Sequence, residues 1–219
     1  ILESILLILA SYLLGSVSSA YLAGKWFAGI DLREYGSGNL GGSMVWEHVG
    51  PWAVIPAGLF DVFKSALPTW LALQFGLGMS VAAAAGIAAV IGHSWSVYLR
   101  FTGGRGMLSY LGVLLVIFPL GAGLFVVLIV AGYLLGGSAP WVLASLVTMP
   151  LVAYFGGGLE IVGPMSAAIV LLALAKRIEA NRRPLPPPGP ERRRVILRRV
   201  FLDRDIASHR EWIDQQPDH

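Results

Sequence analysis

Gly36-Ser-Gly-Asn-Leu-Gly-Gly-Ser43 is the stretch around which the chain is organised, because it separates two long apolar runs. Glycine lets a backbone approach a ligand closely and adopt positive φ angles, and successive N–H groups in such a turn can converge on an anion. We therefore interpret this stretch as a phosphate-binding loop at a membrane surface. A plain turn between two helices is the alternative interpretation of the same residues.

The composition indicates a protein that needs lipid. Of the 219 residues, 56% are hydrophobic and only 13% are charged, with a mean hydropathy of +0.70, whereas a soluble domain carries about 25% charged residues. The absence of cysteine excludes a disulfide framework, thiol chemistry and a cysteine metal site. Because the sequence begins with Ile1, we expect further residues before it, and no signal-peptide cleavage site follows the first apolar segment.

The apolar runs predict transmembrane helices, since about 20 apolar residues cross the hydrocarbon core. Five runs each predict one span, over residues 1–27, 51–74, 79–99, 139–157 and 159–175. The stretch 107–135 is too long for one span, and Pro119 lies near its middle. Whether it forms one helix or two is decided by the distribution of charge.

Basic residues lie at the ends of the first and third spans, at Lys25, Arg33, Arg100 and Arg105, and in the C-terminal tail. The positive-inside rule places all of them in the cytoplasm, which requires an odd number of spans. The stretch 107–135 is therefore predicted to form two short helices. The expected fold is an all-α polytopic integral membrane protein of seven transmembrane helices, with the N-terminus outside, the C-terminus cytoplasmic, and both glycine-rich loops facing the cytoplasm.

The composition changes after the membrane domain, which we assign to residues 1–180. Residues 181–190 are predicted to form a stiff Pro-rich linker. Residues 191–219 are predicted to form a basic amphipathic cytoplasmic tail, with an apolar stripe of Val195, Leu202, Ile206 and Ile213. The tail is expected to contact anionic lipid or a protein partner, the alternative being a solvated helix, and no nucleic-acid partner is expected.

Polar residues inside the spans are the first candidates for function. Asp61 and Lys64 are spaced i, i+3 and are expected to pair on one helix face, either as a structural ion pair or in contact with a ligand. His93 lies within two turns of the second glycine-rich loop, Phe101-Thr-Gly-Gly-Arg-Gly106, and is either structural or part of a site. Arg105 offers a fork of donors that suits phosphate, beside a helix N-terminus. We expect no metal and no cofactor, because the four histidines show no ligand spacing.

Taken together, these motifs resemble the PlsY family of bacterial membrane acyltransferases. The resemblance covers about residues 5–180 and rests on the order and spacing of Gly36-Ser-Gly-Asn-x-Gly41, Asp61-Val-Phe-Lys64 with Leu67-Pro68, Gly92-His93-x-Trp-x-Val-Tyr-x-x-Phe101-x-Gly-Gly-Arg-Gly106, and Leu111-Gly112. It implies transfer of an acyl chain from acyl-phosphate to glycerol 3-phosphate at the bacterial plasma membrane, giving lysophosphatidic acid and phosphate. It also implies that neither a metal nor a covalent enzyme intermediate is needed.

The resemblance also implies roles for residues at the matching positions. The catalytic candidates are Ser37, His93 and Arg105. The candidates for binding substrate or phosphate are Gly36, Gly38, Asn39, Gly41, Ser43, Lys64, Gly103, Gly104 and Asn181.

The chain departs from the family pattern at several positions. Met44 and Glu47 stand where the family has Asn and a substrate-gripping Arg, and Ser96 and Thr102 replace Pro and Lys. Replacing Arg by Glu beside a phosphate loses a charge-assisted bond of about 1.5–3 kcal/mol. Three functions therefore stay open: an acyltransferase, with the family's acceptor or a changed one; a degenerate paralogue that serves as a lipid-binding or accessory subunit of a membrane complex; and a small transporter or channel, for which no inverted repeat is visible.

Overall fold

The computed structural model describes residues 1–35, 38–135, 137–208 and 211–212. Within these residues all regular secondary structure is helical, and the β-type pairing is limited to an isolated bridge between Ser96 and Thr102. The prediction of an all-α fold is confirmed.

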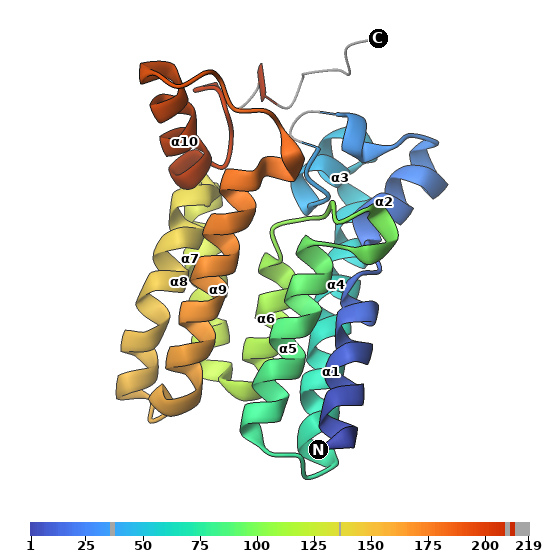
Figure 1. The fold of residues 1–219 in the computed structure, drawn as a ribbon, viewed down its shortest axis with the longest axis vertical. Helices are drawn as coiled ribbons and strands as arrows, with labels where there is room; N and C mark the ends of the chain where they lie inside the picture. The colour runs from blue at the N-terminus through green and yellow to red at the C-terminus, as the bar shows by residue number, and fades with distance from the viewer. Residues whose placement is uncertain (36–37, 136, 209–210, 213–219) are drawn as a thin grey trace.

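The long helices lie side by side and reverse direction from one to the next (Figure 1). They are α1 (Leu2–Gly15), α4 (Pro51–Gln74), α5 (Met79–Ser94), α6 (Met107–Ile117), α7 (Pro119–Leu134), α8 (Ser138–Phe155) and α9 (Leu159–Glu179). The stretch 107–135 forms two helices, as the charge distribution predicted, with the break at Phe118. Within the described residues, three segments are long and apolar enough to cross a membrane: Leu2–Ala28, Ser138–Phe155 and Leu159–Arg182.

The predicted third span, 79–99, is too long, because α5 ends at Ser94. The predicted first span, 1–27, matches the apolar segment Leu2–Ala28, but it is not one regular helix: α1 ends at Gly15 and is followed by the short α2 (Ser19–Ala23) and a π-helical turn (Gly24–Ala28). The break exposes two backbone carbonyls, which accept hydrogen bonds from Ser96 Oγ (Ser16 O, 2.6 Å) and Lys64 Nζ (Val17 O, 2.9 Å). Freed backbone groups inside a helical bundle must find such partners.

Close packing of α1 against α5 depends on small residues. A Cβ atom added to Gly92 would overlap the carbonyl oxygen of Tyr12, and one added to Gly15 would overlap that of Ala89. The two backbones therefore touch, as small residues at helix interfaces in lipid allow. The other half of the bundle has a core of larger side chains from α5 to α9, among them Tyr110, Phe125, Leu146, Met149 and Met165.

The polar segments gather at the end of the bundle opposite the start of α1 (Figure 1). There lie α2, the short α3 (Gly42–His48), the loop that follows α5 with its 3₁₀ turn Val97–Leu99, and the tail helix α10 (Pro190–Leu202). A small apolar cluster of Leu32, Leu40, Met44, Val45 and Leu99 packs beneath the first glycine-rich loop. The loops and the tail thus share one end of the molecule.

The tail helix docks on α8 and α9. Arg177 Nη1 donates to Val200 O (2.6 Å), and Arg199 Nη1 donates to Ile178 O (2.8 Å). The predicted apolar stripe is only partly present. Val195 is buried, but the helix ends at Leu202, so Ile206 lies beyond it, and Ile213 lies outside the described residues. The predicted linker is also shorter than 181–190, because Asn181 belongs to a 3₁₀ turn and Pro190 begins α10.

Candidate functional site

Asn181 joins the two glycine-rich loops. It follows α9, and its Nδ2 donates to Gly38 O (2.7 Å) in the first loop and to Gly103 O (3.1 Å) in the second. Gly103 N donates back to Asn181 Oδ1 at 3.3 Å. A direct bond from Leu40 N to Gly103 O (3.4 Å) completes the junction. The structure therefore brings together three segments that the sequence analysis had singled out separately.

The described part of the first loop leads directly into α3. Asn39 is buried and lies against Gly41, whose carbonyl accepts from the N–H of Met44 (3.1 Å) at the start of α3. Ser43 lies in the first turn of α3 with its side chain exposed. Gly36 and Ser37, the latter a catalytic candidate, lie outside the described residues.

The second loop folds back onto His93, which explains its glycines. Gly104 N donates to His93 O at 3.1 Å. A Cβ atom at Gly104 would overlap His93 Nε2 and come too close to Leu40 O, and one at Gly103 would overlap His93 O. Gly104 is thus required by close approach of the backbone to the imidazole, and Gly103 by close approach to the backbone carbonyl of His93. The Nε2 edge of His93 faces the loop junction, while its Nδ1 edge faces the membrane domain.

Beneath this junction lies a buried cluster of Asp61, Lys64 and His93. Lys64 Nζ forms an ion pair with Asp61 Oδ1 (2.8 Å), as the i, i+3 spacing predicted, and lies 3.0 Å from His93 Nδ1. Its third partner is Val17 O at 2.9 Å. Lys64 has no exposed surface. The candidate substrate ligand Lys64 is therefore held by protein groups, and it orients His93 from below.

Arg105 is held by the C-terminal part of the chain. Its Nε lies 2.7 and 3.0 Å from the two carboxylate oxygens of Asp203, and its Nη1 donates to Lys176 O at 2.9 Å. Lys176 is fully buried. Its Nζ forms an ion pair with Glu179 (2.9 Å) and a cation–π contact with Trp95, 5.0 Å from the centre of the ring. Sequence reasoning missed both Asp203 and Lys176, since they approach Arg105 from 98 and 71 residues away.

A further ion pair, between Asp31 and Arg33, lies on the N-terminal side of the first loop. Arg33 donates to both carboxylate oxygens of Asp31, at 3.0 Å through Nε and 2.6 Å through Nη2. These hydrogen bonds lower the pKa of Asp31 from its ordinary value of 3.8. The Arg33 guanidinium also lies 5.2 Å over the ring of Tyr21. Arg33 thus stabilises the segment that leads into the first loop.

The four residues that the resemblance suggested as departures from the family pattern occupy contrasting places. Met44 is buried, and Glu47 is exposed on α3. Ser96 and Thr102 bond to backbone, Ser96 Oγ to Ser16 O (2.6 Å) and Thr102 Oγ1 to Leu99 O (2.6 Å). These two hydroxyls stabilise the turn before the second loop. Glu47 alone among the four presents a charge to solvent near the first loop.

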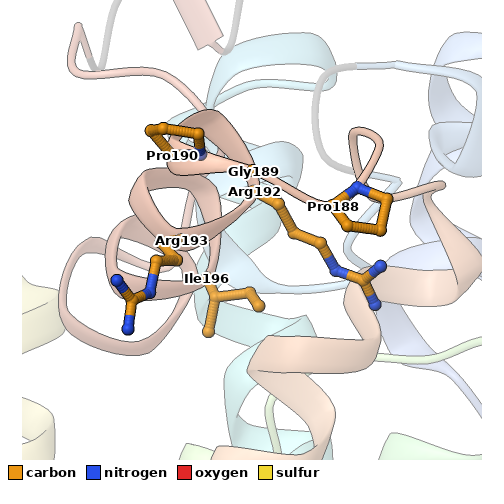
Figure 2. Close-up of a pocket in the computed structure, with 6 residues that line it drawn as sticks. All are labelled: Pro188, Gly189, Pro190, Arg192, Arg193 and Ile196. Atoms are coloured by element: carbon orange, nitrogen blue, oxygen red, sulfur yellow. The ribbon is translucent and has the colours of Figure 1, made fainter.

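A separate hollow lies on the tail (Figure 2). It has a volume of about 600 Å³ and is lined by Pro188, Gly189, Pro190, Arg192, Arg193 and Ile196. It is open to solvent and lies at the start of α10 rather than at the junction of the glycine-rich loops. No group of three or more residues able to hold a metal ion occurs among the described residues.

The fold and the junction define a helical membrane protein whose polar, glycine-lined loops converge at one end. The family model described as Glycerol-3-phosphate acyltransferase matches residues 5–185, and the chain belongs to this family, PlsY. The "Glycerol-3-phosphate acyltransferase 5" of Dehalococcoides mccartyi is 35% identical, covering 96% of this chain and 93% of that protein. The "Glycerol-3-phosphate acyltransferase" of Synechococcus sp. is 36% identical, over 80% of this chain and 88% of that protein.

A solved structure shares the fold. The crystal structure of PlsY, "an integral membrane glycerol 3-phosphate acyltransferase", in its glycerol 3-phosphate form, matches with a TM-score of 0.75 and 27% identity. The match covers 83% of this chain and 91% of that chain. The chain is therefore a membrane protein of the glycerol-3-phosphate acyltransferase family.

Proposed function

We propose that this chain transfers an acyl group from acyl-phosphate to glycerol 3-phosphate or a related phosphorylated acceptor. The products are lysophosphatidic acid, or its counterpart with another acceptor, and inorganic phosphate. Membership of the family supports the proposal, as do the names of the relatives. The observation that carries it is the convergence of both glycine-rich loops, Asn181 and Arg105 at one end of the bundle.

The proposed chemistry needs only positioning and charge stabilisation. The acceptor hydroxyl attacks the acyl carbonyl, the new C–O ester bond forms, and the bond from the carbonyl carbon to the phosphate oxygen breaks. The hydroxyl proton leaves with the phosphate, which is itself a competent base. Acyl-phosphate is already activated, so the protein has to hold two phosphates and align the reacting atoms.

We assign roles in this reaction to the candidate residues. Arg105 and the backbone N–H groups of the two glycine-rich loops stabilise phosphate charge. His93, held through Nδ1 by the buried cluster, presents Nε2 to the loop junction and orders Gly104 or contacts substrate. Ser37 supplies a hydroxyl in the first loop, beside the described residue Gly38.

We further propose seven membrane spans, with the N-terminus outside and the C-terminus in the cytoplasm of a bacterial cell. The opposite placement of the start of α1 and of α10 supports an odd number of crossings (Figure 1). The absence of cysteine makes this testable by single-cysteine labelling in intact cells. Gly123 lies near the start of α7 and Arg182 just after α9, so cysteines at these positions should report opposite sides when α7, α8 and α9 all cross the membrane. A membrane-impermeant maleimide that labels Arg182→Cys from outside would refute the orientation.

The outer face of α10 carries exposed apolar and basic side chains. Leu197 and Phe201 are more than half exposed there, flanked by the exposed Arg193 and Arg194. Apolar side chains between arginines at a membrane surface fit an anionic leaflet. We propose that this face contacts anionic lipid in the cytoplasmic leaflet.

The experiment is turnover by the purified protein with a long-chain acyl-phosphate and glycerol 3-phosphate, followed as released phosphate. Arg105→Ala should abolish most activity, while Arg182→Asn, an exposed residue in a left-handed conformation that Asn tolerates, should retain it. If the protein releases phosphate neither with glycerol 3-phosphate nor with other polyols as acceptor, the proposed enzymatic activity is refuted. The exposed Glu47 favours one further candidate, an accessory subunit, which stoichiometric co-purification with a larger complex would support.

A further inference from the structure

Arg105 owes its orientation to a residue that the family model does not include. The model matches residues 5–185, whereas the carboxylate that pairs with Arg105 belongs to Asp203, at the end of α10. The side chains of the pair are largely buried, with 10% and 19% of their surface exposed. The contact is therefore largely shielded from water and does not lie on a solvated rim, where ion pairs contribute little.

The geometry leaves the guanidinium able to bind a second anion. Arginine has five N–H donors, and here Nε serves Asp203 and one hydrogen of Nη1 serves Lys176 O. Among the described residues, no further acceptor takes the remaining three. Asp203 and Lys176 O thus fix the guanidinium and leave one N–H of Nη1 and both N–H groups of Nη2 for a phosphate.

Asp203 itself is placed by its backbone and by the docked tail. It ends α10 in a left-handed conformation (φ 57°, ψ 36°), a position usually filled by glycine. An aspartate is tolerated there and adds a carboxylate that glycine lacks. Two anchors hold the segment: Arg177 bonds Val200 O, and buried Arg199 pairs with Asp205 (2.6 Å). The carboxylate is thus presented by a structured element.

Charge balance gives Asp203 a second reason to be there. Arg105 touches the backbone of Lys176, which is followed by Arg177, so three cations meet at the end of α9. Repulsion from the charges of Lys176 and Arg177 would push the Arg105 side chain away from the loop junction. A carboxylate on the Nε edge compensates and keeps the guanidinium in place.

We propose that Asp203 is a positioning residue for the acyl-transfer site, fixing Arg105 so that its free N–H groups meet substrate phosphate. The C-terminal tail is then a wall of the site. This inference rests on the proposed function for its catalytic consequence, but its core claim is phosphate binding through Arg105. An inhibitory contact, in which Asp203 occupies Arg105 in place of phosphate, makes the opposite prediction.

The experiment combines turnover with a binding measurement on the full chain. Inorganic phosphate is titrated against thermal unfolding of wild type, Asp203→Asn, Asp203→Gly and Arg105→Ala, and kcat and KM are measured for each. Both Asp203 variants suit the left-handed conformation, so the end of α10 is kept. The charge-matched control is Glu191→Gln, an exposed carboxylate in the first turn of the same helix.

We expect both Asp203 variants to weaken phosphate protection and kcat/KM about tenfold, with Glu191→Gln unchanged. In the Arg105→Ala background, Asp203→Asn should add nothing, because the effect passes through Arg105. The inference is overturned if the Asp203 variants keep wild-type phosphate affinity or gain activity, or if their losses add to that of Arg105→Ala. It is also overturned if wild type does not bind phosphate. Phosphate binding without turnover in wild type would refute the proposed function alone.

Discussion

Asn181→Gly removes the bridge between the two glycine-rich loops with little other change. Asn181 has left-handed backbone angles (φ 53°, ψ 41°), which glycine adopts without strain. The substitution therefore deletes the three side-chain bonds to Gly38 and Gly103 and leaves the path of the chain as it is.

The expected magnitude comes from those bonds. Each contributes about 0.5–1.5 kcal/mol net, or about 1.5–4.5 kcal/mol for the three. Asn181 is only half-buried, so water replaces part of what is lost, and about 2 kcal/mol is the expected cost. If the closed junction is the form that binds substrate, kcat/KM falls roughly 30-fold.

The assay is release of phosphate from a long-chain acyl-phosphate with glycerol 3-phosphate as acceptor, in detergent micelles. Asn181→Asp keeps the shape but turns a carboxylate toward two carbonyl oxygens, so it should cost more than Asn181→Gly. Arg182→Asn is the control, being the next residue, exposed and also left-handed. Activity of Asn181→Gly within twofold of wild type would refute the claim that this bridge shapes the site.

Three further changes test other parts of the structure. Gly104→Ala should abolish activity, because its Cβ would overlap the imidazole and a backbone carbonyl, whereas Gly123→Ala has open space and should match wild type in turnover. Asp61→Asn or Lys64→Met alone leaves a buried group without its counter-charge and should lower the free energy of unfolding by about 3–5 kcal/mol; the double variant Asp61→Asn/Lys64→Met, which still removes the Lys64 bonds to Val17 O and His93, should cost less than the sum of the two, and additive losses would contradict the pairing. Because the paired guanidinium lowers the pKa of Asp31, that pair stabilises the fold above pH about 4 and loses its effect as pH falls further; Asp31→Asn should flatten this part of the pH profile of denaturant unfolding, and an unchanged profile would contradict it.

Helix positions could be predicted well because apolar length and punctuation are local signals. The predicted span 51–74 coincides with α4, and Pro119 marks the start of α7. The predicted span 1–27 did not include the break after α1. Its carbonyls are satisfied by Ser96 and Lys64, which arrive from distant parts of the chain. Such partners have no local signature.

The site was predicted in its components and missed in its connections. The glycine-rich loops and Asn181 were named from the sequence, yet their mutual hydrogen bonds depend on how α9 packs against α5. Asp203 carried no signal, because an acidic residue after a basic helix is ordinarily a solvated one. Only the docking of α10, through Arg177 and Arg199, brings it to Arg105.

Glu47→Arg asks whether the acceptor pocket is still built for a phosphate. Glu47 is exposed on α3, close in sequence to the first loop, and restoring the family's arginine costs no buried partner. Replacing a negative by a positive charge beside a dianion should lower KM for glycerol 3-phosphate more than tenfold, since a charge-assisted bond is worth about 1.5–3 kcal/mol. Glu47→Gln separates relief of repulsion from new attraction and should give a smaller gain. The gain should weaken with salt, because Glu47 is exposed. If neither variant improves glycerol 3-phosphate use while wild type transfers acyl groups to another polyol, the loops and Arg105 serve the donor, and the acceptor has changed.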